Sequence, residues 1–405
     1  MLASAAEDFR AALRARPAAA HLHERLATTY AARATLDRDP RDVAAAVAHF
    51  RRAIALAPAD ASVHVALFRF ALTQRPALLD VALGAGQSAL RHDPRAIERV
   101  LDEAVPLGLT DDQWLSIAPA SASERLRLGL GLERRALVGP ATRLARDARN
   151  LATAPAEDAA ARWLLARLLL LQSDLDGALR EIVEARGRHA LNPELAFMHG
   201  EILRARGDAQ CVDAYRAAVA SAAKAPRGAA DGALVAFDVA DPSLRAVLNG
   251  HHVKASRLKY GMALGTYLTS VGLWRVALRE MTDVVAQHGD HAAARFLLGA
   301  ALDGVGEVDR ALDEYRRAVA LDGRAPFRSR LAQRLWDTRQ HHQAIAEWRI
   351  IVEREPRNLE ARLSLARALA KTGDRTGAAR EYRAALEIDG TNAAARRELA
   401  QNEGR

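Results

Sequence analysis

The fold of this 405-residue chain is decided by residues 361–390, which read ARLSLARALAKTGDRTGAAREYRAALEIDG. The first half places three apolar residues on one face of a helix: Leu365, Ala366 and Leu369. Gly373 then signals a stop, because glycine adopts the left-handed conformation of a helix C-cap without steric strain. The second half has the spacing i, i+4, i+7 of another helix face: Ala378, Tyr382 and Ala385. The stretch therefore predicts a hairpin of two helices.

The same pattern is written four times between residues 258 and 392. Its marker alanines follow one another at steps of 34, 33 and 34 residues: Ala277, Ala311, Ala344 and Ala378. A period in this range is the signature of a stacked repeat. No single hairpin can bury both of its apolar faces, so each hairpin needs its neighbour.

The order small–Leu–small–Ala–aromatic–Ala–Pro/Gly resembles the tetratricopeptide repeat, a helix–turn–helix unit that stacks into a right-handed superhelix. The resemblance implies an all-α fold, a right-handed superhelical solenoid of stacked helical hairpins. Four adjacent matches make the signal specific. We expect degenerate repeats toward the N-terminus and one irregular insert.

Four regions follow from the pattern along the chain. Residues 1–223 read as tetratricopeptide-like repeats, several of them degenerate, and 224–257 read as an irregular insert or hinge. Residues 258–392 hold the four regular repeats, and 393–405 form a C-terminal capping helix.

Two local stretches of these regions depart from the repeat pattern. Arg33 to Asp42 contain Asp39-Pro40 as a helix breaker and predict a lengthened turn inside one repeat. Ala233–Val239 is a short apolar run that fits a strand or a loop tucked into the groove.

The charge pattern favours a solvated surface over a site for a polyanion. The net charge is +8, and only four basic residues are lysine, which leaves 54 arginines spread along the predicted helices near Asp or Glu. No basic stretch is interleaved with aromatic residues, so we expect no nucleic-acid partner.

Composition also bears on compartment and covalent framework. Cys211 is the only cysteine, which excludes an intramolecular disulfide framework and a multi-cysteine zinc set. Glu7 and Asp8 interrupt the N-terminus, where a secretory signal would need an apolar core. The most apolar run, 163–171, contains Arg167 and is too short to span a bilayer. We expect a cytoplasmic protein without direct membrane insertion; a periplasmic or extracellular location fits if the N-terminus is incomplete.

No pattern in the chain predicts catalysis, a cofactor or a metal. The adjacent histidine pairs are His251-His252 and His341-His342. Neighbouring side chains point apart, whereas a zinc site needs three or four convergent ligands, commonly at i and i+4 on a helix. Serine–histidine–aspartate motifs, phosphate-binding loops and HExxH are missing from the sequence, so we predict a non-catalytic protein.

The resemblance implies a concave groove lined by fixed positions of each first helix. In this sequence the groove and partner-binding candidates at those positions are Lys259, Met262, Thr266, Phe296, Gln333, Trp336, Asp337, Arg367 and Lys371. Trp336 has two interpretations of equal weight. It either anchors an extended peptide or a helix in the groove, or packs between hairpins.

Three functions of different classes fit this architecture. The first is a protein–protein interaction scaffold that binds a peptide or protein segment in the groove. The second is self-assembly: the chain opens on a second-type helix with Phe9 and Leu13 and closes on a first-type helix with Leu399, so head-to-tail contacts would build a filament or tube. Both end helices also fit simple caps. The third, by analogy with bacterial cell-envelope assembly proteins, is the soluble repeat tail of a larger protein.

Overall fold

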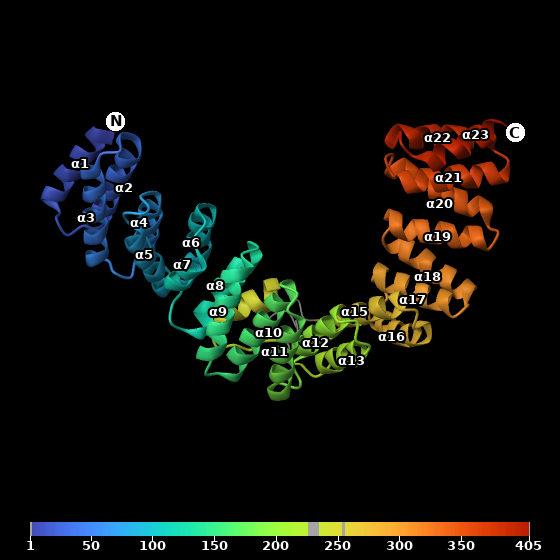
Figure 1. Ribbon diagram of the computed structural model, residues 1–405, viewed down its shortest axis with the longest axis horizontal. Coiled ribbons are helices and arrows are strands. Elements are labelled where there is room, and N and C mark those ends of the chain that lie inside the picture. Colours follow the sequence, from blue (N-terminus) through green and yellow to red (C-terminus); the bar gives the residue numbers. More distant parts are fainter. Residues whose placement is uncertain (1, 226–234, 253–255, 405) are drawn as a thin grey trace. The chain divides into compact units, whose positions relative to one another are not determined.

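The computed structural model describes residues 2–225, 235–252 and 256–404, and the side chains of Gly250 to His252 lie outside the description. Every regular element in these residues is helical, which confirms the all-α stacked-hairpin class. The chain divides into two compact units, Met1–Ser256 and Arg257–Arg405 (Figure 1). The right-handed superhelical winding stays a prediction.

The second unit consists of consecutive helices that pair as hairpins and pack on the next pair. Its helices are α15 (Arg257–Ser270), α16 (Trp274–Gln287), α17 (Ala292–Gly304), α18 (Val308–Leu321), α19 (Ala325–Asp337), α20 (His341–Arg354), α21 (Leu359–Thr372), α22 (Arg375–Ile388) and α23 (Ala393–Glu403). The odd-numbered helices are the first helices of the predicted repeats, and the even-numbered ones are the second helices.

The turn inside each hairpin of this unit uses one left-handed residue. Gly272, Gly306 and Gly373 have φ values of +77°, +89° and +93°. Arg339 takes the equivalent place in the third hairpin with φ of +61°. A residue with a Cβ atom, such as arginine, carries a steric penalty of about 1–2 kcal/mol in the left-handed conformation. The helices on either side therefore impose this turn.

Small residues lie where the helix axes approach closely, and one aromatic residue fills each remaining gap. Ala311, Ala344 and Ala378 are at most 1% exposed. A Cβ atom on Gly299 would lie 2.9 Å from the ring of Tyr315, so only glycine fits there without a shift. The seams between hairpins are therefore narrow and closely packed.

A repeated ion pair links the first and second helices of a hairpin, always between residues 19 positions apart. The pairs are Arg295 with Glu314 (2.8 Å), Arg328 with Glu347, Arg362 with Glu381 (2.7 Å) and, in the first unit, Arg162 with Glu181 (2.8 Å). Arg328 and Arg362 also donate to the loop carbonyls of Gly323 and Pro356. Arg328 and Arg362 thus each tie a hairpin to the loop before it.

The first unit contains more irregular hairpins. Its helices are α1 (Leu2–Ala15), α2 (Ala20–Asp37), α3 (Pro40–Leu56), α4 (Ala61–Thr73), α5 (Leu79–His92), η1 (Pro94–Ala96), α6 (Ile97–Ala104), η2 (Val105–Leu107), α7 (Asp111–Ile117), α8 (Ala122–Arg134), α9 (Val138–Leu151), α10 (Pro155–Leu171), α11 (Leu175–Arg188), α12 (Pro193–Ala205), α13 (Cys211–Ala222), α14 (Pro242–Ala246) and the π-helix η3 (Val247–His252).

The lengthened turn expected at 33–42 is wrong. The additional residues extend α2 to Asp37 and start α3 at Pro40, so that only Arg38 and Asp39 form the turn. Asp39 accepts a hydrogen bond from the backbone N–H of Arg41 and caps α3, and proline is well placed at the first position of a helix. The same dipeptide that breaks one helix begins the next.

The insert is helical in its second half and irregular before it. Residues 235–239 form no strand, while Ala233 and Leu234 lie outside the described residues. Asp241 caps α14 by accepting hydrogen bonds from the N–H groups of Ser243 and Leu244. Segment 235–249 packs inside the first unit, where α14 contacts α8.

Helices α11 and α12 meet at a half-buried histidine. Nη1 of Arg186 donates a hydrogen bond to Nδ1 of His199, which therefore acts as the acceptor of a neutral ring. Burial, reinforced by the Arg186 charge, lowers the pKa of His199 to about 4. Protonation of this ring would remove the acceptor and place two positive charges together.

We predict that Ala344→Leu lowers the free energy of unfolding by about 1–3 kcal/mol, because the added atoms overpack a seam that has no free space. Urea unfolding followed by circular dichroism measures the change. Ala346→Leu on the same helix is the matched control, since Ala346 is exposed and should shift stability by less than about 0.5 kcal/mol. Equal effects of the two substitutions would contradict the close seam.

We also predict that the first unit loses stability as the pH falls from about 6.5 toward 4. In this range the unfolded chain protonates His199 and the folded chain does not, so the unfolded state binds more protons. The contribution is complete above the unfolded pKa and changes by at most about 1.4 kcal/mol per pH unit. Urea midpoints between pH 4.5 and 7.5 should depend less on pH in His199→Gln, whose amide oxygen still accepts from Arg186. An unchanged dependence would assign the effect to other groups.

Candidate partner-binding site

Trp336, near the C-terminal end of α19, is a half-buried aromatic side chain with ring partners on its inner side. Its ring centroid lies 6.1 Å from that of Trp348 and 4.2 Å from that of His341, both on α20. The Nζ atom of Lys371, on α21, lies 5.9 Å from the Trp336 centroid. The ring is thus held by the hairpin on one side and covered by an ammonium group from the next hairpin.

These side chains border a small hollow of about 140 Å³ between α19, α20 and α21. Its lining residues are Gln333, Trp336, Trp348, Ser364, Arg367, Ala368 and Lys371. On α21 the lining positions follow i, i+3, i+4 and i+7, which places them on one face of that helix. The hollow therefore lies on the face that first helices α19 and α21 share.

The charges around the hollow are partly neutralised by local partners. Arg367 makes two hydrogen bonds with the carboxylate of Glu398 on α23, at 2.8 and 3.1 Å. Burial tends to raise the pKa of Glu398, but the bonds from Arg367 outweigh it and lower that pKa. Burial, together with the Glu398 charge, raises the pKa of the nearby Tyr382 to about 12. Among the described ion pairs none involves Lys371, which is exposed.

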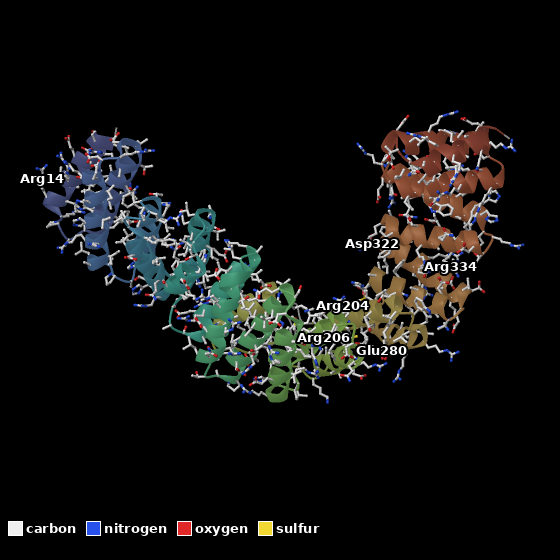
Figure 2. All side chains as sticks on the ribbon, in the orientation of Figure 1. Arg14, Arg204, Arg206, Glu280, Asp322 and Arg334 are labelled. Carbon is white, nitrogen blue, oxygen red and sulfur yellow. The ribbon has the colours of Figure 1, made fainter. Side chains whose placement is uncertain are left out.

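Asp337 is also engaged within its own helix. It accepts hydrogen bonds from Gln333 at 2.9 Å and from Arg334 (labelled in Figure 2) at 3.0 Å. Arg334 in turn pairs with Asp303, whose side chain is 6% exposed. The acidic groups beside the hollow are thus balanced, and Lys371 supplies its unbalanced charge.

The structure brings only some of the expected groove residues together. Gln333, Trp336, Arg367 and Lys371 line one hollow, and Asp337 lies beside them. Phe296 instead packs between hairpins, with its ring stacked on Phe327 at 4.9 Å.

The three remaining groove candidates lie on α15. Nζ of Lys259 lies 5.3 Å from the ring of Tyr260, and Met262 is partly buried against the core of the second unit. The hydroxyl of Thr266 donates to the backbone oxygen of Met262. None of these three lines the Trp336 hollow.

Sequence reasoning missed three residues of this hollow, Trp348, Ser364 and Ala368. Trp348 occupies the aromatic position of a second helix, where the repeat pattern indicates only a core role. Ser364 precedes Arg367 by one helical turn, and that spacing was the available signal for it.

The residues expected at self-assembly ends lie on end helices. Phe9 is partly buried and Leu13 is 9% exposed on α1, and Leu399 of α23 packs partly buried against the core of the second unit. Head-to-tail assembly stays a prediction.

The first unit has a larger hollow of about 710 Å³ whose charges pair among themselves. Buried Arg162 contacts Asp158, Glu181 and Glu184, and Arg188 contacts Asp158 and Glu184. A new ion would have to displace these contacts. We assign this cluster to the joint between α10 and α11.

Within the described residues, no group of three or more histidine, cysteine or acidic side chains is placed to hold a metal ion. His341 packs on Trp336, and the side chains of His251 and His252 lie outside the description. In the same described part of the chain, no helix combines the length and apolarity needed to cross a bilayer.

Comparison with known proteins agrees with this architecture. The family model "Tetratricopeptide repeat" matches residues 262–326 and 329–393. With the stacked hairpins, this match identifies residues 262–393 as tetratricopeptide repeats. Repeats of this class typically mediate protein–protein interaction and have no catalytic activity.

Several solved structures are similar to parts of the chain at low identity. The C-terminal part of a TPR repeat-containing protein from Cytophaga hutchinsonii is 15% identical, with a TM-score of 0.50 over 68% of this chain and 99% of that one. MamA is 21% identical over 51% of this chain and 96% of its own, with a TM-score of 0.38. YrrB, described as a TPR protein with an unusual peptide-binding site, is 18% identical over 41% and 84%, with a TM-score of 0.33. No curated protein matches the chain.

Proposed function

We propose that the second unit binds an extended segment of a partner protein at the hollow formed by Gln333, Trp336, Arg367 and Lys371. The unit supplies shape and charge and no chemistry of its own. The observation that carries this proposal is the half-buried Trp336 ring beneath the exposed Lys371 ammonium group.

The size of the hollow favours a single anchoring side chain. Sites for small molecules and cofactors have volumes of about 300–1,000 Å³, whereas this hollow has about 140 Å³. An apolar side chain of a partner segment fits such a space against an aromatic wall. Tryptophan is enriched among the residues that contribute most to binding energy at protein interfaces.

The anchor is already in place before binding. Trp348 and His341 contact the Trp336 ring from its own hairpin, so the ring has little rotational freedom left to lose. Preorganisation of this kind improves affinity by lowering the entropy lost on association. Under this proposal Trp336 serves both interpretations, since its ring contacts its own hairpin and also lines the hollow.

The charge balance selects the class of segment. Arg367 is neutralised by Glu398, and Asp337 is neutralised by Arg334. Lys371 then makes the mouth of the hollow positive, which favours a carboxylate in the ligand next to its apolar anchor. We therefore expect a segment with an aromatic or aliphatic residue close to Asp or Glu.

The test is selection of random twelve-residue peptides displayed on phage against the purified chain. We expect enriched peptides to pair an apolar residue with an acidic one. Trp336→Ala should lower their affinity at least about tenfold, because it removes the anchoring wall. Lys371→Glu should lower the peptide affinity more at low salt than at high salt, since the lost contact is electrostatic. Fluorescence anisotropy of the selected peptides measures both.

The matched control is Arg349→Glu, which reverses the charge of an exposed arginine on second helix α20. It should leave peptide affinity within about twofold. Arg367 is a poorer target because its loss would also release Glu398. Peptides that bind Trp336→Ala as tightly as the unaltered chain would contradict the groove assignment.

A further inference from the structure

Residues 235–249 lie on side chains from α8, α10 and the start of α12. Each of these is the first helix of a hairpin in the first unit. The ring of Phe237 lies 5.6 Å from that of Trp163 on α10. Helix α14 contacts α8, and this yellow segment lies beside α8 and α10 in Figure 1. The insert therefore covers the face on which a tetratricopeptide-repeat unit would receive an external segment.

The segment meets this face as an extended peptide would. From Phe237 to Ala240 buried and exposed side chains alternate: Phe237 and Val239 are 1% and 0% exposed, while Asp238 and Ala240 are exposed; Ala236, before them, is buried. Alternation of this kind is the period of extended backbone, which turns every second side chain to the same surface. Leu244 and Leu248, both fully buried, continue the contact through α14 and η3.

Side chains of the repeat helices hold the backbone and the charge of the segment. The Asn192 amide, at the start of α12, donates a hydrogen bond to the backbone oxygen of Ala236 at 2.7 Å. Arg127 on α8 is only 7% exposed, and its Nη2 lies 3.4 Å from Oδ2 of Asp241. A buried guanidinium is strongly destabilising without an acidic partner, so this position is built to receive a carboxylate.

The segment also keeps its own shape. The side-chain oxygen of Asn249 accepts hydrogen bonds from the backbone N–H groups of Ala236 and Phe237, at 3.0 and 3.1 Å. Its amide donates to the oxygen of Phe237 at 2.7 Å. Local bonds of this kind persist if the segment leaves the helices, so it can dock as a preformed ligand.

The face is wider than its occupant. Beside Phe237 a hollow of about 450 Å³ remains, with Pro155, Ala156, Ala159 and Leu191 among its lining residues. Leu191 is 66% exposed. Apolar surface is therefore still available next to the position that Phe237 fills.

We propose that the first-helix face of α8, α10 and α12 is a second peptide-binding groove, occupied in cis by residues 235–249. Its external ligand is an extended protein segment with two apolar side chains two residues apart and an acidic residue two positions later, the pattern of Phe237, Val239 and Asp241. This ligand competes with the chain's own segment for Trp163 and Arg127. None of these residues lines the Trp336 hollow.

The experiment measures binding of a fluorescent peptide with the sequence of residues 235–249, VAFDVADPSLRAVLN, to the full chain. In the unaltered chain the cis segment competes, so binding is weak. Asp241→Asn in the chain removes the carboxylate that pairs with Arg127 but keeps the N-cap of α14, because Asn caps as well as Asp. We expect the peptide to bind this variant about tenfold more tightly, because the fraction of open grooves rises. Phe237→Ala should act in the same direction.

Matched arginines on α8 provide the control. In the Asp241→Asn chain, Arg127→Gln should weaken peptide binding about tenfold, since the peptide loses its carboxylate partner. Arg125→Gln, which removes a pair with Asp147 on α9, should leave it within about twofold. A peptide carrying Asn in place of the aspartate of position 241 should bind about tenfold more weakly than the original.

Circular dichroism checks that each variant stays helical, and if Phe237→Ala loses helical signal, Asp241→Asn alone decides. Equal peptide affinity of the unaltered and Asp241→Asn chains would overturn the proposal. So would no binding to the helical Asp241→Asn variant, which would make residues 235–249 a permanent part of the core. Equal effects of the two α8 substitutions would overturn the role of Arg127.

Discussion

Close contact between small side chains at the seams of neighbouring helices is the constraint on which the rest of this structure depends. Alanines such as Ala311 and Ala344 are buried, and glycine is required where Gly299 meets the ring of Tyr315. The helix axes can then approach, and each hairpin covers the apolar face of the one before it. The packing at the seams stabilises the stack without the side chains that face outward from the first helices. Those outward side chains are free to vary, and binding surfaces can form there.

The arginine-rich composition follows from the same architecture. Pairs such as Arg362 with Glu381 recur at a separation of 19 residues and join the two helices of a hairpin. Charged side chains extend from helices throughout both units (Figure 2). Ion pairing within the chain thus uses many of its arginines. None of the described ion pairs involves Lys371, whose charge lies at one hollow. A guanidinium suits the repeated pairs because it can contact a carboxylate and a loop carbonyl together.

The candidate site was partly predictable. Position within the repeat placed Gln333, Trp336, Arg367 and Lys371 on one surface, and the structure brings these four together. It also neutralises Arg367 through Glu398, a contact between helices that no helical spacing predicts. Phe296 differs, because its ring stacks on Phe327 of the next hairpin and does not line this hollow. Repeat position predicts the face of a side chain, and its neighbours from other hairpins decide whether it is available.

The sequence by itself determined the repeat, because the 33- to 34-residue period, the turn glycines and the alanine seams are local and need no distant partner. The tertiary structure alone decided how the irregular residues are used. The turn expected at 33–42 became helix because Asp39 caps and Pro40 begins α3. The insert docks on α8, α10 and α12 because Arg127, Trp163 and Asn192, each from a different helix, converge on it. Such convergence depends on distances through space, which periodicity along the chain does not encode.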